Sequence, residues 1–174
     1  APAWAGARRI AVLGGAGAGK STLARRLGEA LGLPVAHLDI LVYGPGWTRR
    51  APDEVRARLS AALGDEGWIV DGTYGEAHDL TLPHADLVIW IDQPAWLRLW
   101  RCWRKTRLNR GRARPDRPDG CEEAFGWRYA RMALSFGAWT AAMRNELSTH
   151  ARTPVLRLRG DAAVARFLSG EADA

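Results

Sequence analysis

Short apolar runs alternate with helix-like blocks along this chain. The apolar runs cover residues 10–13, 35–38, 68–70, 87–91 and 155–158. They are apolar at nearly every position rather than at every second one, which is typical of strands buried on both faces. Strands of this kind, separated by helices, predict a parallel sheet with helices covering both of its faces.

Five segments carry the signals of helices. Pro52, with two acids directly after it, is typical of a helix start, and Gly32 and Gly64 are typical of helix ends. The longest segment has apolar residues at steps of four and three from Phe125 to Leu147, which predicts one face packed on a core. The expected helices cover residues 20–31, 52–63, about 95–108, 125–147 and 162–168.

Length and composition predict one globular domain over residues 1–174, since 47% of the chain is apolar. Residues 110–121, rich in Arg, Pro, Gly and Asp, interrupt the alternation and predict a loop. No uncharged stretch reaches the roughly 20 residues of a membrane span. Two cysteines in no paired motif, and no signal-peptide pattern, predict a cytoplasmic protein without a zinc site.

Positive charge concentrates in one segment. The chain has 25 Lys and Arg against 19 Asp and Glu, a net charge of +6. Residues 98–117 contain nine of the bases and a single acid, so this segment carries +8 and the remainder −2. We expect it to face a polyanion locally, either the phosphates of a nucleotide or a nucleic acid.

A phosphate-binding motif lies between the first strand and the first helix. Residues 14–21 read Gly-Gly-Ala-Gly-Ala-Gly-Lys-Ser, which matches G-x-x-x-x-G-K-[ST] in the context the motif requires. The glycines let successive backbone N–H groups face phosphate oxygens. Lys20 would contact the β- and γ-phosphates, and Ser21 would coordinate Mg²⁺. We expect ATP or GTP on Gly15, Ala16, Gly17, Ala18, Gly19, Lys20, Ser21 and Thr22.

Aspartates follow three of the predicted strands. Because parallel strands end at the same edge of a sheet, Asp39 and Asp71 are expected near the γ-phosphate. We assign Asp71, with Ser21, to Mg²⁺, and Asp39 to the base that accepts a proton from an attacking hydroxyl. Each could instead cap the helix or turn that follows. Asp92 is interpreted as such a cap.

The predicted helix 95–108 has two unlike faces. Trp96, Trp100 and Trp103 share one arc and are interpreted as core packing, with most of the bases on the other side. The basic side and the loop after it predict a lid that closes over ATP and neutralises the transferred phosphoryl group. Arg101 and Arg104 are the candidate catalytic arginines. The alternative is a solvated basic face.

A turn-rich loop after Asp39 is the expected acceptor site. Trp47 in this loop could stack on a flat substrate, and Arg49 or Arg50 could pair with an anionic group. Tyr74, close behind Asp71, completes the candidate substrate residues.

These motifs, together with His37-Leu38-Asp39, Pro45-Gly46-Trp47, Asp71-Gly72 and Asp92-Gln93-Pro94, resemble the adenylate-kinase-like P-loop kinases. The chain is most similar to the bacterial topology modulation proteins, which are related to shikimate kinase and chloramphenicol phosphotransferase. The resemblance implies a three-layer α/β P-loop fold, a five-stranded parallel sheet with helices on both faces, ATP, Mg²⁺ and a short Arg-rich lid at 110–121.

The resemblance also implies roles for single residues. Arg101 would pack on adenine, Asp71 would serve the metal site, and Asp39 would be the base, as in shikimate kinase and chloramphenicol phosphotransferase. Thr73-Tyr74 stands where adenylate kinases have Phe-Pro-Arg, which disfavours a nucleoside monophosphate as acceptor.

The leading hypothesis is an ATP-dependent phosphotransferase that moves the γ-phosphoryl group to a hydroxyl of a small molecule. The acceptor could be a metabolite, a nucleoside or an antibiotic, in which case the enzyme confers resistance. The alternatives are a nucleotide or nucleoside monophosphate kinase, a nucleic-acid-associated ATP-binding protein that affects DNA topology, and a nucleotide-binding switch. The sequence motifs identify neither the acceptor nor the oligomeric state.

Overall fold

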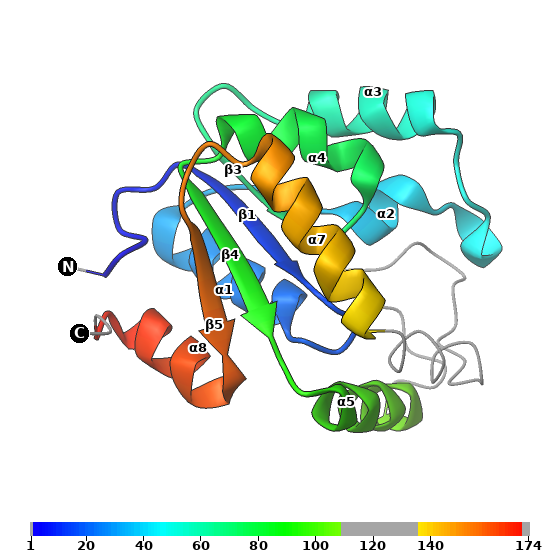
Figure 1. The fold of residues 1–174 in the computed structure, drawn as a ribbon. Helices are drawn as coiled ribbons and strands as arrows, with labels where there is room; N and C mark the ends of the chain where they lie inside the picture. The colour runs from blue at the N-terminus through cyan, green and yellow to red at the C-terminus, as the bar shows by residue number, and fades with distance from the viewer. Residues whose placement is uncertain (1, 109–135, 172–174) are drawn as a thin grey trace.

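One parallel sheet forms the centre of the molecule. The computed structural model describes residues 2–108 and 136–171. The strands lie in the order β2-β3-β1-β4-β5 and every neighbouring pair is parallel, which confirms the predicted five-stranded sheet (Figure 1). Their bounds are β1 (Arg9–Gly14), β2 (Val35–His37), β3 (Trp68–Asp71), β4 (Leu87–Asp92) and β5 (Val155–Arg159).

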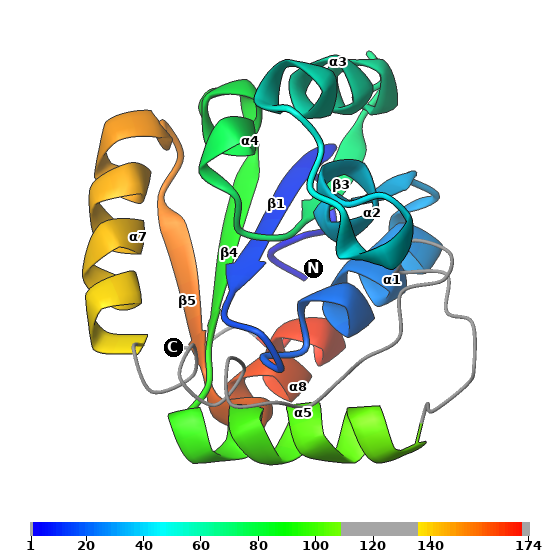
Figure 2. The same cartoon turned by 90° about the vertical axis from the view of Figure 1, so that its right-hand side faces the viewer.

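Helices cover both faces of this sheet, as expected (Figures 1 and 2). One face is covered by α1 (Lys20–Leu31) and α8 (Gly160–Ser169). The other is covered by α2 (Leu38–Val42), α3 (Pro52–Ala62), α4 (Gly75–Thr81) and α7 (Phe136–His150). A further helix, α5 (Ala95–Leu108), lies at the carboxyl ends of the strands, and short 3-10 helices cover Pro45–Trp47 and Leu82–His84.

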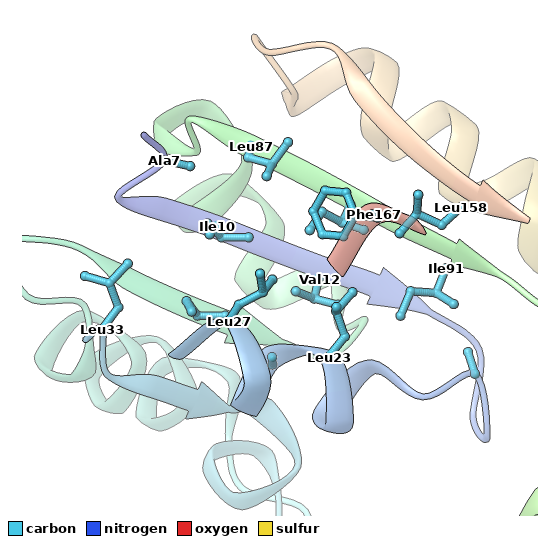
Figure 3. Packing of buried hydrophobic residues seen from close by; sticks show 14 of the residues in the cluster. Ala7, Ile10, Val12, Leu23, Leu27, Leu33, Leu87, Ile91, Leu158 and Phe167 are labelled. Carbon is cyan, nitrogen blue, oxygen red and sulfur yellow. The ribbon is translucent and has the colours of Figure 1, made fainter. Parts of the chain in front are cut away.

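Alternate residues of each strand enter two separate cores. On β1, Ile10 and Val12 face α1 and α8, where they meet Leu27 and Phe167 (Figure 3). Ala11 and its alternate neighbours face the helices of the opposite side. Each large apolar side chain buried in this way contributes about 1.5–3 kcal/mol relative to its exposed form. The continuous apolar runs of the sequence therefore follow from burial on both faces.

The sequence pattern does not predict two short helices, α2 and α4. Strand β2 ends at His37, and Leu38 already begins α2, so the predicted strand 35–38 is one residue too long. Neither α2 nor α4 is long enough to repeat an apolar face more than about twice, and periodicity does not detect them. The described part of the fourth predicted helix, α7, continues to His150. Residues 125–135 and the predicted lid at 110–121 lie outside the described residues.

The predicted packing of α5 is wrong. Trp96, Trp100 and Trp103 are 69%, 47% and 44% exposed, whereas Arg98 and Cys102 are buried. The helix packs through this buried side on the phosphate-binding loop. A Cβ built on Gly17 would lie 2.5 Å from the Arg98 carbonyl oxygen and 2.8 Å from Cys102 Sγ.

Replacement of Gly17 by alanine is therefore expected to destabilise the fold more than the same change at Gly19. Both glycines have positive φ, 77° and 100°, which costs an alanine about 1–2 kcal/mol. Only Gly17→Ala adds a clash with α5, worth about 1–3 kcal/mol, because no atom lies within 4 Å of a Cβ at Gly19. Urea unfolding of the nucleotide-free variants measures the difference, and equal losses would contradict the packing of α5 on this loop.

Within residues 2–108 and 136–171, every helix is too short or too polar to cross a bilayer.

Candidate nucleotide and acceptor site

The loop between β1 and α1 has the geometry of a phosphate cradle. Gly19, the residue before α1, has a left-handed backbone conformation. It has no side chain that could cap the first amides of α1. Lys20 Nζ donates to the Gly15 carbonyl oxygen at 3.2 Å, inside the loop. Amides at a helix N-terminus and a nearby ammonium group attract phosphate oxygens. The loop thus fits a triphosphate, with Ser21 and Thr22 in the first turn of α1.

Thr73 connects the segment that follows β3 to this loop by hydrogen bonds. The Thr73 hydroxyl donates to the Gly14 carbonyl oxygen at 3.2 Å and lies 3.3 Å from the Gly14 amide. Gly72, one residue earlier, donates its amide to the Val12 carbonyl oxygen at 3.2 Å. The chain that follows β3 is therefore held beside the loop, together with the side chains it carries.

Asp71 lies at the end of β3, with 4% of the residue exposed. It is beside Val12 of β1 on one side and beside His37 of β2 on the other. Its Oδ1 is 2.7 Å from His37 Nδ1, a hydrogen bond that fixes the carboxylate.

Mg²⁺ is bound in proteins by one or two carboxylates together with substrate phosphates. The donors available here, the Ser21 hydroxyl and the Asp71 carboxylate, are oxygens of the kind that this ion prefers. In the described ranges no group of three or more His, Cys, Asp or Glu could hold a metal. A site completed by the nucleotide therefore fits this set of residues, whereas an all-protein site does not.

Asp39 is held at the same edge of the sheet. It lies in the first turn of α2, and the Tyr74 hydroxyl donates to its Oδ1 at 2.5 Å. A Cβ on Gly72 would lie 2.6 Å from Leu38 Cβ, so only glycine permits this close approach of α2 to the end of β3. The structure thus brings Asp39 and Tyr74 together beside the segment that Thr73 ties to the phosphate loop.

The two predicted acceptor arginines have partners within the protein. Arg49 Nη2 is 2.6 Å from Glu76 Oε1, and this hydrogen bond raises the pKa of Arg49. Burial pushes the pKa of Glu76 up, but hydrogen bonds from its own amide and from Arg49 outweigh burial and lower it. Arg50 Nη1 donates to the carbonyl oxygens of Ile40, Leu41 and Tyr43, and Arg50 Nε is 3.3 Å from Glu54.

The two candidate arginines of α5 have different partners in the structure. Arg101 Nη2 is 2.5 Å from Asp161 Oδ2, so it joins α5 to the start of α8. Arg104 instead lies 5.2 Å over the exposed Trp100 ring. Burial lowers the pKa of Arg98, while Cys102 and Asp92 act in the opposite direction.

A cavity of about 440 Å³ opens between the ends of β4 and β5. Gln93 Nε2 donates to Asp161 Oδ1 at 2.9 Å near its rim. Asp92, interpreted from the sequence as a cap, has a further partner, since its Oδ2 is 2.6 Å from Arg157 Nη2 of β5. The cavity lies at the carboxyl edge of the sheet, where α/β folds bind ligands. Its lining consists of Asp92, Gln93, Pro94, Ala95, Arg159 and Gly160.

Several residues of the site were missed in the sequence. His37 pairs with Asp71 because the two are in register on adjacent strands, so a correct strand register would have found the pair. Thr73 and Glu76 lie beside predicted residues, but their partners are 59 and 27 residues away along the chain.

Comparison with known proteins identifies the fold. No protein-family model matches the chain, and no curated protein matches its sequence. Shikimate kinase from Acinetobacter baumannii, in complex with shikimate, superposes with a TM-score of 0.58 at 17% identity, over 96% of this chain and 92% of that one. Shikimate kinase from Bacteroides thetaiotaomicron gives a TM-score of 0.53 at 16% identity, over 94% and 95%. The chain thus has the α/β P-loop fold of the shikimate kinases.

Proposed function

We propose that this protein is an ATP-dependent kinase that phosphorylates a hydroxyl group of a small molecule. The observation that carries the proposal is the chain of contacts from Gly14 through Thr73 and Tyr74 to Asp39. It holds a carboxylate beside a loop built for phosphates, which is the pairing that hydroxyl phosphorylation needs. The fold shared with shikimate kinases supports the same reaction class.

In this proposal the nucleotide binds through both of its ends. Its phosphates would bind the loop amides and Lys20, and its base would enter the cavity at the ends of β4 and β5, next to Arg101. Ser21 and Asp71 would hold Mg²⁺, which neutralises phosphate charge when it is bound. GTP would fit the same loop, since contacts to the phosphates do not distinguish guanine from adenine.

Asp39 acts on the acceptor. Its carboxylate accepts the hydroxyl proton while the hydroxyl oxygen forms a bond to the γ-phosphorus. The bond from that phosphorus to the bridging oxygen of ATP breaks, and ADP leaves with the electron pair. Lys20 stabilises the negative charge on the transferred group. The products are the phosphorylated acceptor, with its proton on Asp39, and ADP.

The identity of the acceptor is open to experiment. An antibiotic with a free hydroxyl, such as a nucleoside-type compound, suits a half-buried base with aromatic neighbours, and its phosphorylation would confer resistance. A role like that of the bacterial topology modulation proteins remains a prediction from the sequence resemblance.

A screen for phosphorylated products tests the proposal. The protein is mixed with Mg-ATP and a library of hydroxyl compounds, and mass spectrometry searches for a product heavier by one phosphoryl group together with ADP. We expect at least one acceptor to be phosphorylated well above the rate of ATP hydrolysis alone. ATP binding without any product across the library would overturn the proposal in favour of a nucleotide-binding switch.

A further inference from the structure

Three aromatic rings form a row of contacts that begins at the proposed base. Tyr43 follows α2, Trp47 ends a 3-10 helix, and Tyr74 precedes α4. The Tyr43 ring is 5.5 Å from Trp47 at an interplanar angle of 77°, and 6.2 Å from Tyr74 at 71°, both edge-to-face contacts. Since Tyr74 also donates to Asp39, a continuous aromatic cluster runs from the base to Trp47, which is 38% exposed.

The backbone of Trp47 is strained. In the described part of the chain, Trp47 is the one residue other than glycine with a positive φ, 59°. This conformation is unfavourable for a bulky residue, because its Cβ lies too close to the following carbonyl oxygen. The turn that imposes it is closed by the Gly44 amide, which donates to the Thr48 carbonyl oxygen at 2.8 Å, and by a bridge between Tyr43 and Arg49. Strain that the surroundings maintain in this way is typical of ligand-binding positions.

Among residues 2–108 and 136–171, three arginines on the elements that carry or flank the cluster have partners within the protein. Arg49 is paired with Glu76, and Arg56 of α3 is 2.7 Å from Asp79 of α4. Arg50 is held by three backbone carbonyls. An anionic acceptor would have to share one of these guanidinium groups with the carboxylate or carbonyl oxygens that it already contacts, and that negative charge weakens the attraction for a second anion. An uncharged ring needs no such sharing, because it packs on aromatic side chains directly.

We propose that the acceptor is an aromatic or flat heteroaromatic alcohol without a carboxylate or phosphate group. Its ring packs on the cluster of Tyr43, Trp47 and Tyr74, and its hydroxyl reaches Asp39. The inference rests on the proposed kinase function and narrows it to a substrate class. The transfer itself is unchanged: the acceptor O–H bond breaks, an O–P bond forms, and ADP leaves.

Three matched acceptors test the substrate class. They are 2-phenylethanol, 2-cyclohexylethanol, which lacks the aromatic ring, and 4-(2-hydroxyethyl)benzoate, which adds a carboxylate. Since an aromatic contact contributes about 0.5–1.5 kcal/mol beyond area burial, we expect kcat/KM for 2-phenylethanol to exceed that of 2-cyclohexylethanol by roughly 3- to 10-fold. It should also exceed that of the benzoate, because the added carboxylate meets arginines that are already paired. Mass spectrometry and coupled ADP release measure the rates.

Variants of Trp47 test whether the preference for an aromatic acceptor arises at the aromatic cluster. Trp47→Leu should raise KM for 2-phenylethanol and abolish the preference, whereas Trp47→Phe, which keeps a ring, should retain most of it. Trp96→Leu is the matched control, because Trp96 is exposed on α5 and lies outside the cluster. Circular dichroism melts establish that each variant is folded.

The outcomes separate this inference from the kinase proposal. A preference that is lost in Trp47→Leu but kept in Trp47→Phe and Trp96→Leu supports it. Equal rates with the saturated ring, a preference for the carboxylate, or a library whose only acceptors are non-aromatic would overturn the inference while the kinase remains. A library without any phosphorylated product would instead refute the kinase itself.

Discussion

Replacement of Lys20 by alanine is expected to lower kcat for phosphoryl transfer by about 10²–10³-fold, the usual cost of removing one preorganised charge or donor at a transition state. The ammonium group is the cation placed inside the phosphate loop, 3.2 Å from the Gly15 carbonyl oxygen. Without it, the charge that develops on the transferred phosphoryl group loses the ammonium group that this loop supplies. Steady-state rates with any acceptor found by the screen measure the loss, and calorimetry with Mg-ATP measures the accompanying change in affinity.

Arg25→Ala is the control for this prediction. Arg25 is a cation on the same helix, exposed to solvent and just over one turn beyond Lys20. Its removal should leave kcat within about twofold, since exposed charges a few residues from a site are largely screened. If Lys20→Ala kept wild-type turnover, the loop would not carry the transferred phosphate. If Mg-ATP and Mg-GTP both produced no heat with the wild-type protein, the nucleotide site itself would be disproved.

The sheet and the conformation of the glycine-rich loop were predictable from the sequence for local reasons. Residues 87–91 are apolar on both faces because β4 is buried on both faces, and this burial leaves a direct trace in the sequence. The loop at 14–21 is equally local, since the backbone conformation it needs is encoded by the glycines within it.

The packing of α5 was not predictable for the opposite reason. Helical spacing correctly groups Trp96, Trp100 and Trp103 on one side, but spacing alone does not tell which side meets the core. The buried side of the helix carries Arg98 and Cys102, which lie against Gly17, and neither is a large apolar side chain. The spacing of large apolar residues therefore predicts the wrong buried side for α5.

The pairs that build the site depend on strand register. His37 meets Asp71 because β2 and β3 pair at those two residues. Asp39 meets Tyr74 because Gly72 lets Leu38 approach the end of β3. A sequence pattern places Asp39 and Asp71 at one edge of the sheet, but it does not reveal which neighbour each carboxylate will bind.

Replacement of Asp39 by asparagine is expected to lower kcat by about 10²–10⁴-fold, the range for a general base. Asparagine has nearly the same shape, and its amide oxygen can still accept the hydrogen bond from Tyr74 that holds the aspartate at 2.5 Å. The substitution thus removes proton acceptance and leaves the geometry. Because Asp39 does not belong to the phosphate loop, the affinity for Mg-ATP should stay within about twofold, a free-energy change smaller than that of one hydrogen bond.

Asp65→Asn separates this effect from a general loss of negative charge. Asp65 is exposed in the turn before β3, at the amino end of the strands, and its carbonyl oxygen contacts Arg9 of β1. This variant should retain full activity and the same melting temperature. An Asp39→Asn enzyme with wild-type kcat would show that the acceptor hydroxyl loses its proton without this carboxylate. The contact between Tyr74 and Asp39 would then fix the aromatic cluster in place and take no part in the chemistry.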